Sequence, residues 1–244
     1  MTSIQLDRLT IPARPAPVRR RRPPEPTTTE SDHAERAVRS LNVAAALLGL
    51  IIAAPVMALV AVVIRLTSPG PILYRQTRVG MDRRWRERDK SHSRRRHDLG
   101  GRPFTIFKFR TMVYRPDRDA AVWASPDDPR ITTVGRVLRK VRLDELPQLW
   151  NVLRGDMNIV GPRPEQPRIF VRLREQIDEY GVRQRVRPGI TGLAQINHHY
   201  DRTIDDVRKK VAFDLEYIAR RSVMEDLKIM ALTVPVIVFR RGAW

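Results

Sequence analysis

An uncharged stretch of 24 residues, from Leu41 to Ile64, limits what this chain can fold into more than any other feature. Thirteen of its residues are Leu, Ile or Val, and at roughly −0.3 to −0.6 kcal/mol each they favour insertion into a bilayer by about 4–8 kcal/mol. Asn42 lies near one edge, where a polar group costs little. A buried core helix is the alternative, but a small soluble domain rarely hides so long an apolar run in one helix. We therefore predict a helix inserted in a membrane.

The flanks of this stretch disagree with a simple span. Arg36 and Arg39 precede it and Arg65 follows it, whereas positive charge usually marks the cytoplasmic side alone. Pro55 removes a backbone donor and kinks or breaks a helix. Each arm of a helix broken there would be about 15–20 Å long, too short for a hydrocarbon core of ~30 Å. The residues favour a re-entrant hairpin with both ends on one side, and a true span remains the alternative.

The rest of the chain divides around this helix. The first 33 residues hold six of the 19 prolines and a run of four arginines, so they cannot bury enough apolar surface to offset their ordering entropy. The segment 81–101 carries eight cations and is predicted to be a surface loop. The predicted divisions are a disordered basic tail at 1–33, a re-entrant membrane helix at 34–66, a catalytic domain at 67–222 with a basic insertion at 81–101, and a C-terminal interface helix at 223–244.

Hydropathy patterns predict a mainly helical α+β fold. Two segments rich in aromatic and β-branched residues, 72–79 and 104–110, are predicted strands of a short β-hairpin. Apolar residues recur every three or four positions over 204–218, which indicates an amphipathic helix. The segment 229–239 is apolar but too short to span, and it is typical of an interface or core helix.

Charge and composition narrow the chemistry. The net charge is +19, and 40 of the 46 cations are Arg, which binds phosphate in a bidentate manner better than Lys. Such a surplus implies a polyanionic neighbour: nucleic acid, acidic lipid headgroups or phosphorylated substrates. The absence of Cys excludes disulfides, thiolate metal sites and Cys nucleophiles. No Ser-His-Asp pattern, Walker-type loop or Rossmann fingerprint occurs.

The carboxylates Asp144 and Glu145 are the first candidates for catalysis. Proline is tolerated in a helix only within the first turn, so Pro147 predicts a helix that starts at about Glu145 with Asp144 near its N-cap. The partial positive charge of a helix N-terminus would keep Asp144 ionised, which suits a metal ligand or a carboxylate nucleophile. A plain capping role is the alternative, because Asp is a good N-cap.

Several cations are placed to bind a phosphate. Lys108 and Arg110 share one face of a predicted strand, although a solvated strand face would look the same. Arg163 stands between two prolines that fix the backbone on either side, so its guanidinium is preorganised for a bidentate contact. With a candidate metal ligand at hand and no redox or thiol group, these residues favour phosphoryl transfer.

A later segment of small residues and turn formers is a further candidate. Gly189 and Gly192 would permit close approach of the backbone to a ligand. Arg187 and Gln195 lie within the same segment and are predicted to reach that ligand.

Four long blocks in fixed order resemble the bacterial sugar transferases of the small monotopic phosphoglycosyl transferase superfamily. The blocks are SPGPILYRQTRVG, FTIFKFRTM, LRKVRLDELPQLWNVLRGDMNIVGPRP and VRPGITGLAQIN. The resemblance covers about residues 36–244. This chain departs from many relatives at 198–202, where His-His-Tyr-Asp-Arg stands in place of Gly-Arg. Larger relatives carry transmembrane helices ahead of this module, and we expect none here.

The resemblance implies an enzyme that transfers sugar-1-phosphate from a UDP-sugar to polyprenyl (undecaprenyl) phosphate and releases UMP. It would catalyse the first membrane step in the synthesis of an exopolysaccharide or another glycoconjugate. The expected location is the cytoplasmic face of the inner membrane, with a monotopic anchor that turns back at Pro55. The expected partners are the UDP-sugar donor, the polyprenyl phosphate acceptor and the lipid bilayer, with a homodimer left open and nucleic acid not expected.

The resemblance also assigns roles to single residues. Asp144 matches the nucleophile that forms a phosphosugar-aspartyl intermediate, and Glu145 matches its partner. Mg²⁺ would bridge Asp144 and the donor diphosphate. Arg163 matches the nucleotide-binding arginine of a Pro-Arg-Pro motif, and Lys108 and Arg110 match a phosphate-side segment. The alternatives are a silent membrane scaffold of the same fold and a basic nucleic-acid-binding protein, which would leave the apolar helix without a role.

Overall fold

The computed structural model describes residues 28–82, 99–114, 128–197 and 203–238. Within these residues it confirms a mainly helical α+β fold with one long apolar helix near the N-terminus and two small sheets. The predictions for the first 27 residues, for most of the basic insertion and for the last six residues lie outside the described residues.

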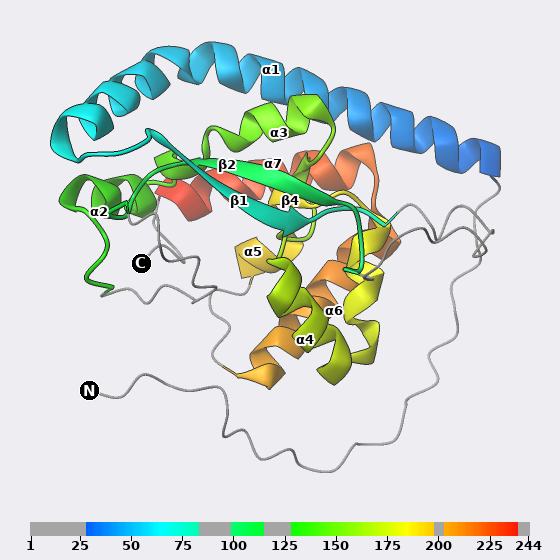
Figure 1. Ribbon diagram of the computed structural model, residues 1–244. Coiled ribbons are helices and arrows are strands. Elements are labelled where there is room, and N and C mark those ends of the chain that lie inside the picture. The colour runs from blue at the N-terminus through cyan, green and yellow to red at the C-terminus, as the bar shows by residue number, and fades with distance from the viewer. Residues whose placement is uncertain (1–27, 83–98, 115–127, 198–202, 239–244) are drawn as a thin grey trace.

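The elements follow one another with short connections. In chain order they are α1 (Thr28–Thr67), β1 (Leu73–Val79), β2 (Pro103–Phe109), α2 (Thr133–Lys140), the 3₁₀ turn η4 (Leu143–Glu145), α3 (Gln148–Arg154), β3 (Asn158–Val160), α4 (Pro167–Gln176), the 3₁₀ segment η5 (Asp178–Arg185), β4 (Gly189–Thr191), α5 (Leu193–Asn197), α6 (Ile204–Arg220) and α7 (Val223–Val238). Figure 1 shows α1 along one side of the molecule and the helices α4 and α6 on the opposite side.

Helix α1 is helical without interruption through Pro55, and it begins six residues before the predicted start at residue 34. A re-entrant hairpin is therefore not shown. One face of α1 is buried, and its members lie four residues apart at each end of the helix: Val38, Asn42, Ala46, Val60 and Ile64. The outward face is apolar and 41–80% exposed: Leu47, Leu48, Ile51, Ile52, Val56, Leu59, Val62 and Leu66. Among the described helices, α1 alone is long and apolar enough to cross a membrane.

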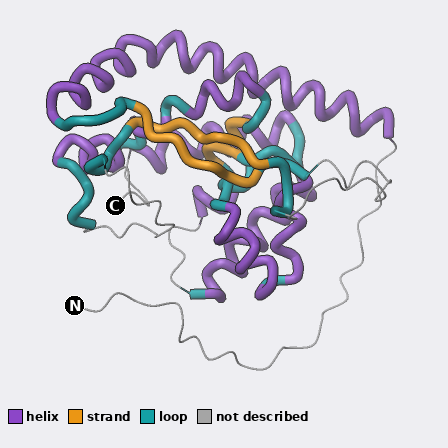
Figure 2. Tube along the Cα trace, in the orientation of Figure 1, coloured by secondary structure: helices purple, strands orange, loops and turns teal. Residues whose placement is uncertain are grey.

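The predicted hairpin is confirmed. Strands β1 and β2 pair in antiparallel register, with Thr77 opposite Thr105. Figure 2 shows the hairpin between α1 and the lower helices. Phe109 of β2 packs with Val60 and Ile64 of α1, and Val79 at the end of β1 packs with α4 and α6. The hairpin thus joins α1 to the rest of the core.

The amphipathic helix predicted over 204–218 is α6. Val207 and Val211 are buried in a cluster with Phe170 of α4 and Tyr180 of η5, as the helical period requires. Helix α7 buries Ile229 and exposes a second apolar set: Met224, Leu227, Leu232 and Val234.

Strands β3 and β4 form a parallel pair that the sequence did not predict. A Cβ on Gly189 would lie 2.1 Å from the Gly161 nitrogen, and a Cβ on Gly192 would lie 2.4 Å from the Gly161 oxygen. The close approach that these glycines permit is therefore between two segments of this chain, and the expectation that they face a ligand is wrong.

Asn42 is fully buried, which corrects the expectation that it sits at an inexpensive edge position. Its amide nitrogen donates to Asp226 of α7 at 2.9 Å, and its oxygen accepts from the Ile159 amide at 2.6 Å. Tyr217 of α6 donates to the other Asp226 oxygen at 2.8 Å. This polar group therefore joins α1, β3, α6 and α7, and its hydrogen bonds offset the cost of burying it.

Candidate active site

The two candidate carboxylates lie in η4, the 3₁₀ turn between α2 and α3. Arg142, which precedes the turn, has a φ of 59°, a left-handed conformation that is uncommon for a residue with a side chain. Helix α3 begins at Gln148 with Pro147 as its N-cap residue. The prediction of a helix starting at Glu145 with Asp144 as its cap is therefore wrong by three residues, because the proline closes a separate turn before the α-helix begins.

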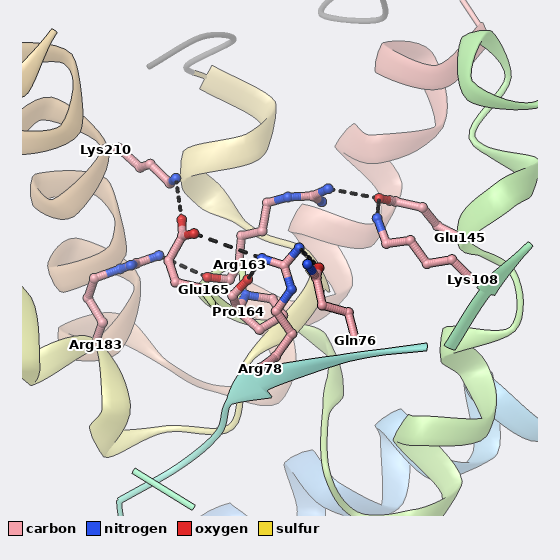
Figure 3. A network of polar contacts seen from close by, with 9 residues as sticks. All are labelled: Gln76, Arg78, Lys108, Glu145, Arg163, Pro164, Glu165, Arg183 and Lys210. Carbon is pink, nitrogen blue, oxygen red and sulfur yellow. Dashed lines mark hydrogen bonds and ion pairs between the residues drawn. The ribbon is translucent and has the colours of Figure 1, made fainter. Parts of the chain in front are cut away.

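Glu145 is held by cations from three parts of the chain (Figure 3). Its Oε1 atom lies 2.6 Å from Lys108 Nζ of β2 and 2.8 Å from Arg163 Nη2. Arg142 Nη1 lies 3.9 Å from the Oε2 atom. Burial alone would raise the pKa of Glu145, but Arg163, Lys108 and Arg142 together hold it well below its usual range. Glu145 therefore stays ionised, and its ion pairs hold Lys108 and Arg163 at the site.

Asp144 has a different environment. It is 7% exposed, and within the described part of the chain its carboxylate makes no ion pair of 4.0 Å or less. Burial raises the pKa of Asp144 to about 6, and the charge of Glu145 adds to the rise, while Lys108 and Arg139 oppose it. The expectation that a helix N-terminus keeps this group strongly ionised is therefore wrong, because Asp144 lies in the turn before the helix.

The contrast between the carboxylates determines what the site can do. A carboxylate locked in two short ion pairs is a poor nucleophile, whereas Asp144 is uncommitted and lies in a field of cations. Among the described residues, no three His, Cys, Asp or Glu side chains form a metal cage. Mg²⁺ commonly takes one or two carboxylates and completes its shell with substrate phosphates. The site fits such an ion with Asp144 as the protein ligand.

Asn151 of α3 holds the strand that carries Lys108 beside the carboxylate pair Asp144 and Glu145, called the dyad below. The sequence did not identify Asn151. Its side chain is fully buried; it donates to the Thr105 carbonyl at 2.7 Å and accepts from the Phe107 amide at 3.1 Å. Both groups belong to the unpaired edge of β2, so Asn151 fixes that strand against the helix that follows η4. A single Asn in a helix gives no periodic signal that marks it in the sequence.

The side chain of Arg163 reaches Glu145 from a loop between two prolines, and the predicted contact of Arg163 with a phosphate stays a prediction. The sequence did not identify the groups behind that loop. Arg78 donates to the Pro164 carbonyl at 3.1 Å, and Lys210 pairs with Glu165 at 3.2 Å. Arg183 donates to the Arg163 carbonyl at 3.0 Å. In a chain with 40 arginines, charge alone does not separate these residues from solvated ones.

The structure does not bring Arg110 to the carboxylates. Its guanidinium donates to the Pro69 carbonyl at 2.5 Å and to the Ser68 carbonyl and hydroxyl at 2.7 Å each. These groups belong to the turn that follows α1. Arg110 thus ties the end of α1 to β2, although it lies two residues from Lys108.

Arg187 and Gln195 also make their contacts elsewhere. Arg187 donates to the Gly155 carbonyl at 3.1 Å and pairs with Glu35 of α1 at 3.3 Å. Gln195 donates to the Ile190 carbonyl at 3.3 Å. Of the seven predicted site residues, four converge: Asp144, Glu145, Lys108 and Arg163.

Comparisons with known proteins identify the family. The sequence model of the family described as "Bacterial sugar transferase" matches residues 33–240. A Caulobacter vibrioides protein named UDP-glucose:undecaprenyl-phosphate glucose-1-phosphate transferase is 42% identical over 84% of this chain and 71% of its own length. An Escherichia coli (strain K12) protein of the same name is 41% identical over 80% of this chain and 39% of its own.

An Aeromonas hydrophila protein named UDP-N-acetylgalactosamine-undecaprenyl-phosphate N-acetylgalactosaminephosphotransferase is 39% identical over 84% of this chain and 44% of its own length. This chain therefore spans less than half the length of two of these three relatives. The match of the family model extends from α1 through the dyad to the end of α7. The chain belongs to the bacterial sugar transferase family.

Proposed function

We propose that this protein is an undecaprenyl-phosphate sugar-1-phosphate transferase that uses a UDP-sugar donor and a covalent aspartyl intermediate. The observation that carries the proposal is the division within the dyad: Glu145 is paired with Lys108 and Arg163, and Asp144 is uncommitted beside them. The names of the relatives specify both glucose and N-acetylgalactosamine, so the proposal covers the class of UDP-sugars.

The reaction proceeds in two displacements at one phosphorus atom. A carboxylate oxygen of Asp144 attacks the β-phosphorus of the donor, the bond to the oxygen that bridges the two phosphates breaks, and UMP leaves with the electron pair. A phosphate oxygen of the polyprenyl acceptor then attacks the same phosphorus and Asp144 departs as a carboxylate. The product is a polyprenyl diphosphate sugar, and neither step needs donor and acceptor bound together.

The cations at the dyad offset the repulsion between anions. Lys108 and Arg163 are fixed by Glu145, so they would stabilise charge on the phosphoryl oxygens without reorganising during the reaction. Asp144 would hold a Mg²⁺ ion, which would supply neutralisation of negative charge on the donor diphosphate. Arg163 is proposed to bind the nucleotide side of the donor. For Arg110, Arg187 and Gln195 we propose supporting roles through the contacts they make.

We propose that α1 enters the membrane and returns to the cytoplasmic face. Both of its ends are bonded to the same catalytic part: Arg39 donates to the carbonyls of Met157 and Val152, and Arg110 donates to the turn after α1. A helix that crosses ~30 Å of hydrocarbon carries its ends to opposite sides. The exposed apolar faces of α1 and α7 support contact of both helices with lipid.

The covalent intermediate provides the decisive test. The purified protein in detergent, mixed with a UDP-sugar and Mg²⁺ without acceptor and quenched early, should carry one sugar-phosphate on the peptide that contains Asp144. Asp144→Asn should lose the adduct and lower UMP release at least about 10³-fold. Asp205→Asn on the exposed surface of α6 is the matched control, since Asp205 is 77% exposed. An Asp144→Asn protein that releases UMP at the wild-type rate would contradict the proposal.

A further inference from the structure

The main chain at 163–165 is held by hydrogen bonds from two elements, η5 and β1, and Figure 3 shows the two arginines among the donors. Arg183 of η5 donates to the first carbonyl, Arg78 of β1 to the second, and the Val79 amide to the third at 2.9 Å. In Figure 3 the side chain of Arg163 extends away from these groups toward Glu145 and Lys108. The backbone of this loop is therefore held on one side, and the side chain of Arg163 extends from the other side toward the carboxylates.

Arg183 is itself held through two of its guanidinium nitrogens, Nε and Nη2. Its side chain is 0% exposed, and its Nε atom pairs with Asp214 Oδ2 of α6 at 2.6 Å. The guanidinium carbon lies 4.8 Å from the centre of the Tyr180 ring. With one nitrogen on Asp214 and Nη2 on the Arg163 carbonyl, the planar fork has little freedom to rotate.

A role in stability alone explains this arrangement poorly. A buried ion pair contributes little net stability compared with packed apolar residues of similar size, because both charges must be desolvated. Arg183 also donates a hydrogen bond to the carbonyl of Arg163, the residue whose side chain reaches Glu145. The side chain of Arg163 is 35% exposed where it pairs with Glu145, so the position of its guanidinium depends on where its own backbone is held.

We propose that Arg183, oriented by Asp214, is a positioning residue that fixes the backbone of Arg163 so that its guanidinium meets Glu145 and the donor phosphates. The proposal rests on the transferase function argued above and adds a residue that positions one of its binding groups. Arg183 acts through Arg163 and does not contact the reacting atoms. The proposal predicts that substitutions of Arg183 and Arg163 have non-additive effects on catalysis.

The test is a double-mutant cycle in the full-length protein. Arg183→Lys keeps the charge beside Asp214 but loses the fork that reaches the Arg163 carbonyl. We expect it to lower kcat/KM for UMP release about 10–100-fold. In an Arg163→Ala background the same change should lower kcat/KM less than about 2-fold, because the positioned group is gone. An equal loss in both backgrounds, or a folded Arg183→Lys protein with wild-type activity, would overturn the proposal.

A second readout separates positioning from stability. If Arg163 no longer meets the donor phosphates in the right orientation, Arg183→Lys should lower kcat about 10-fold or more while KM for the UDP-sugar changes less than about 3-fold. Arg208→Lys is the control, because Arg208 pairs with Asp205 at 2.9 Å on the exposed side of α6, and it should leave kcat and KM unchanged. An unchanged kcat per folded molecule, with only the folded fraction reduced, would indicate a structural role and overturn the proposal.

Two measures keep the proposal testable if folding or turnover fails. Where Arg183→Lys does not fold, Asp214→Asn keeps the shape of the partner and should show the same coupling to Arg163→Ala. Where the wild-type protein releases no UMP, the transferase proposal fails, but binding of UDP can still be measured by calorimetry without turnover. Arg183→Lys should weaken UDP binding at least about 3-fold in the wild-type background and less than about 1.5-fold in the Arg163→Ala background, and equal losses in both backgrounds would overturn the positioning role independently of turnover.

Discussion

Single residues show how one fold gives two adjacent carboxyl groups opposite tendencies. Both Asp144 and Glu145 are 7% exposed, so burial penalises the charge of each. Glu145 recovers that cost through ion pairs with Lys108 and Arg163, whereas Asp144 does not pair directly. Environments that push two pKa values apart commonly mark a division of labour between acidic groups.

The pH dependence of the rate should report Asp144. Its pKa is raised to about 6 by burial and by Glu145, and the nucleophile must be ionised to attack. We expect kcat/KM for UMP release to fall as pH drops through about 6, with a slope of one proton. Glu145 has a lowered pKa and should not contribute to that limb. A rate that stays constant down to pH 4.5 in folded protein would contradict this assignment.

The same shift predicts an unusual effect on stability. The folded state binds the Asp144 proton more tightly than the unfolded chain, whose Asp pKa is about 3.9. Ionisation of Asp144 therefore costs stability at neutral pH, and this cost disappears as pH falls below both values. Asp144→Asn should be more stable than wild type at pH 7.5, by on the order of 2 kcal/mol, and the gain should vanish near pH 4. Denaturant unfolding of protein without substrate or metal would measure both.

Among the elements, the parallel pair β3–β4 holds the Pro-Arg-Pro loop against the segment that follows η5. The two strands approach so closely that Gly189 has no room for a side chain, with the Gly161 nitrogen 2.1 Å from a Cβ placed there. The pair is only three residues long on each side, so a small shift would disrupt all of it.

Gly189→Ala should therefore destabilise the protein by about 2 kcal/mol or more, because backbone atoms must move to admit the methyl group. Gly181→Ala in η5 is the matched control. A Cβ at Gly181 would meet only the Arg174 side chain, at an ordinary 3.9 Å. Equal unfolding midpoints for the two variants in denaturant would refute the packing argument.

The sequence predicts elements better than it predicts contacts between them. The hairpin follows from its aromatic and β-branched residues, and α6 follows from a periodic apolar face that it buries against the core. The predicted start of the helix after the carboxylates was displaced by three residues, since Pro147 is compatible with several positions near a helix N-terminus. Asn151 and Arg183 were missed for another reason: their partners are distant in sequence, 31 residues away for Arg183 and Asp214, and no local pattern encodes such a pair.

The site shows the same division. Neighbouring residues with charges, such as Asp144 and Glu145, could be proposed from the sequence, and Lys108 joins them because β2 presents it to η4. Arg110 lies two residues further along the chain, yet it binds the end of α1. Alternation along a strand fixes a face, but it does not specify where the chain turns after the strand ends at Phe109.

The topology of the whole molecule can be tested because the chain contains no Cys. Single cysteines at Ala34 and Thr67, both exposed near opposite ends of α1, should both react with an impermeant thiol reagent from the cytoplasmic side of membrane vesicles. Ser68 is left intact because Arg110 binds it. Labelling of the two positions from opposite sides would establish a span and overturn the hairpin.

Helix α1 supplies Ala46, Val60 and Ile64 to the same clusters that bury β2 and α3. Deleting residues 1–67 would therefore expose apolar residues of the catalytic part and would not yield an active soluble enzyme. A water-soluble derivative requires substitutions on the outward face of α1. Polar, helix-favouring residues would replace exposed ones such as Leu48, Ile52 and Leu59, and the buried face would stay unchanged.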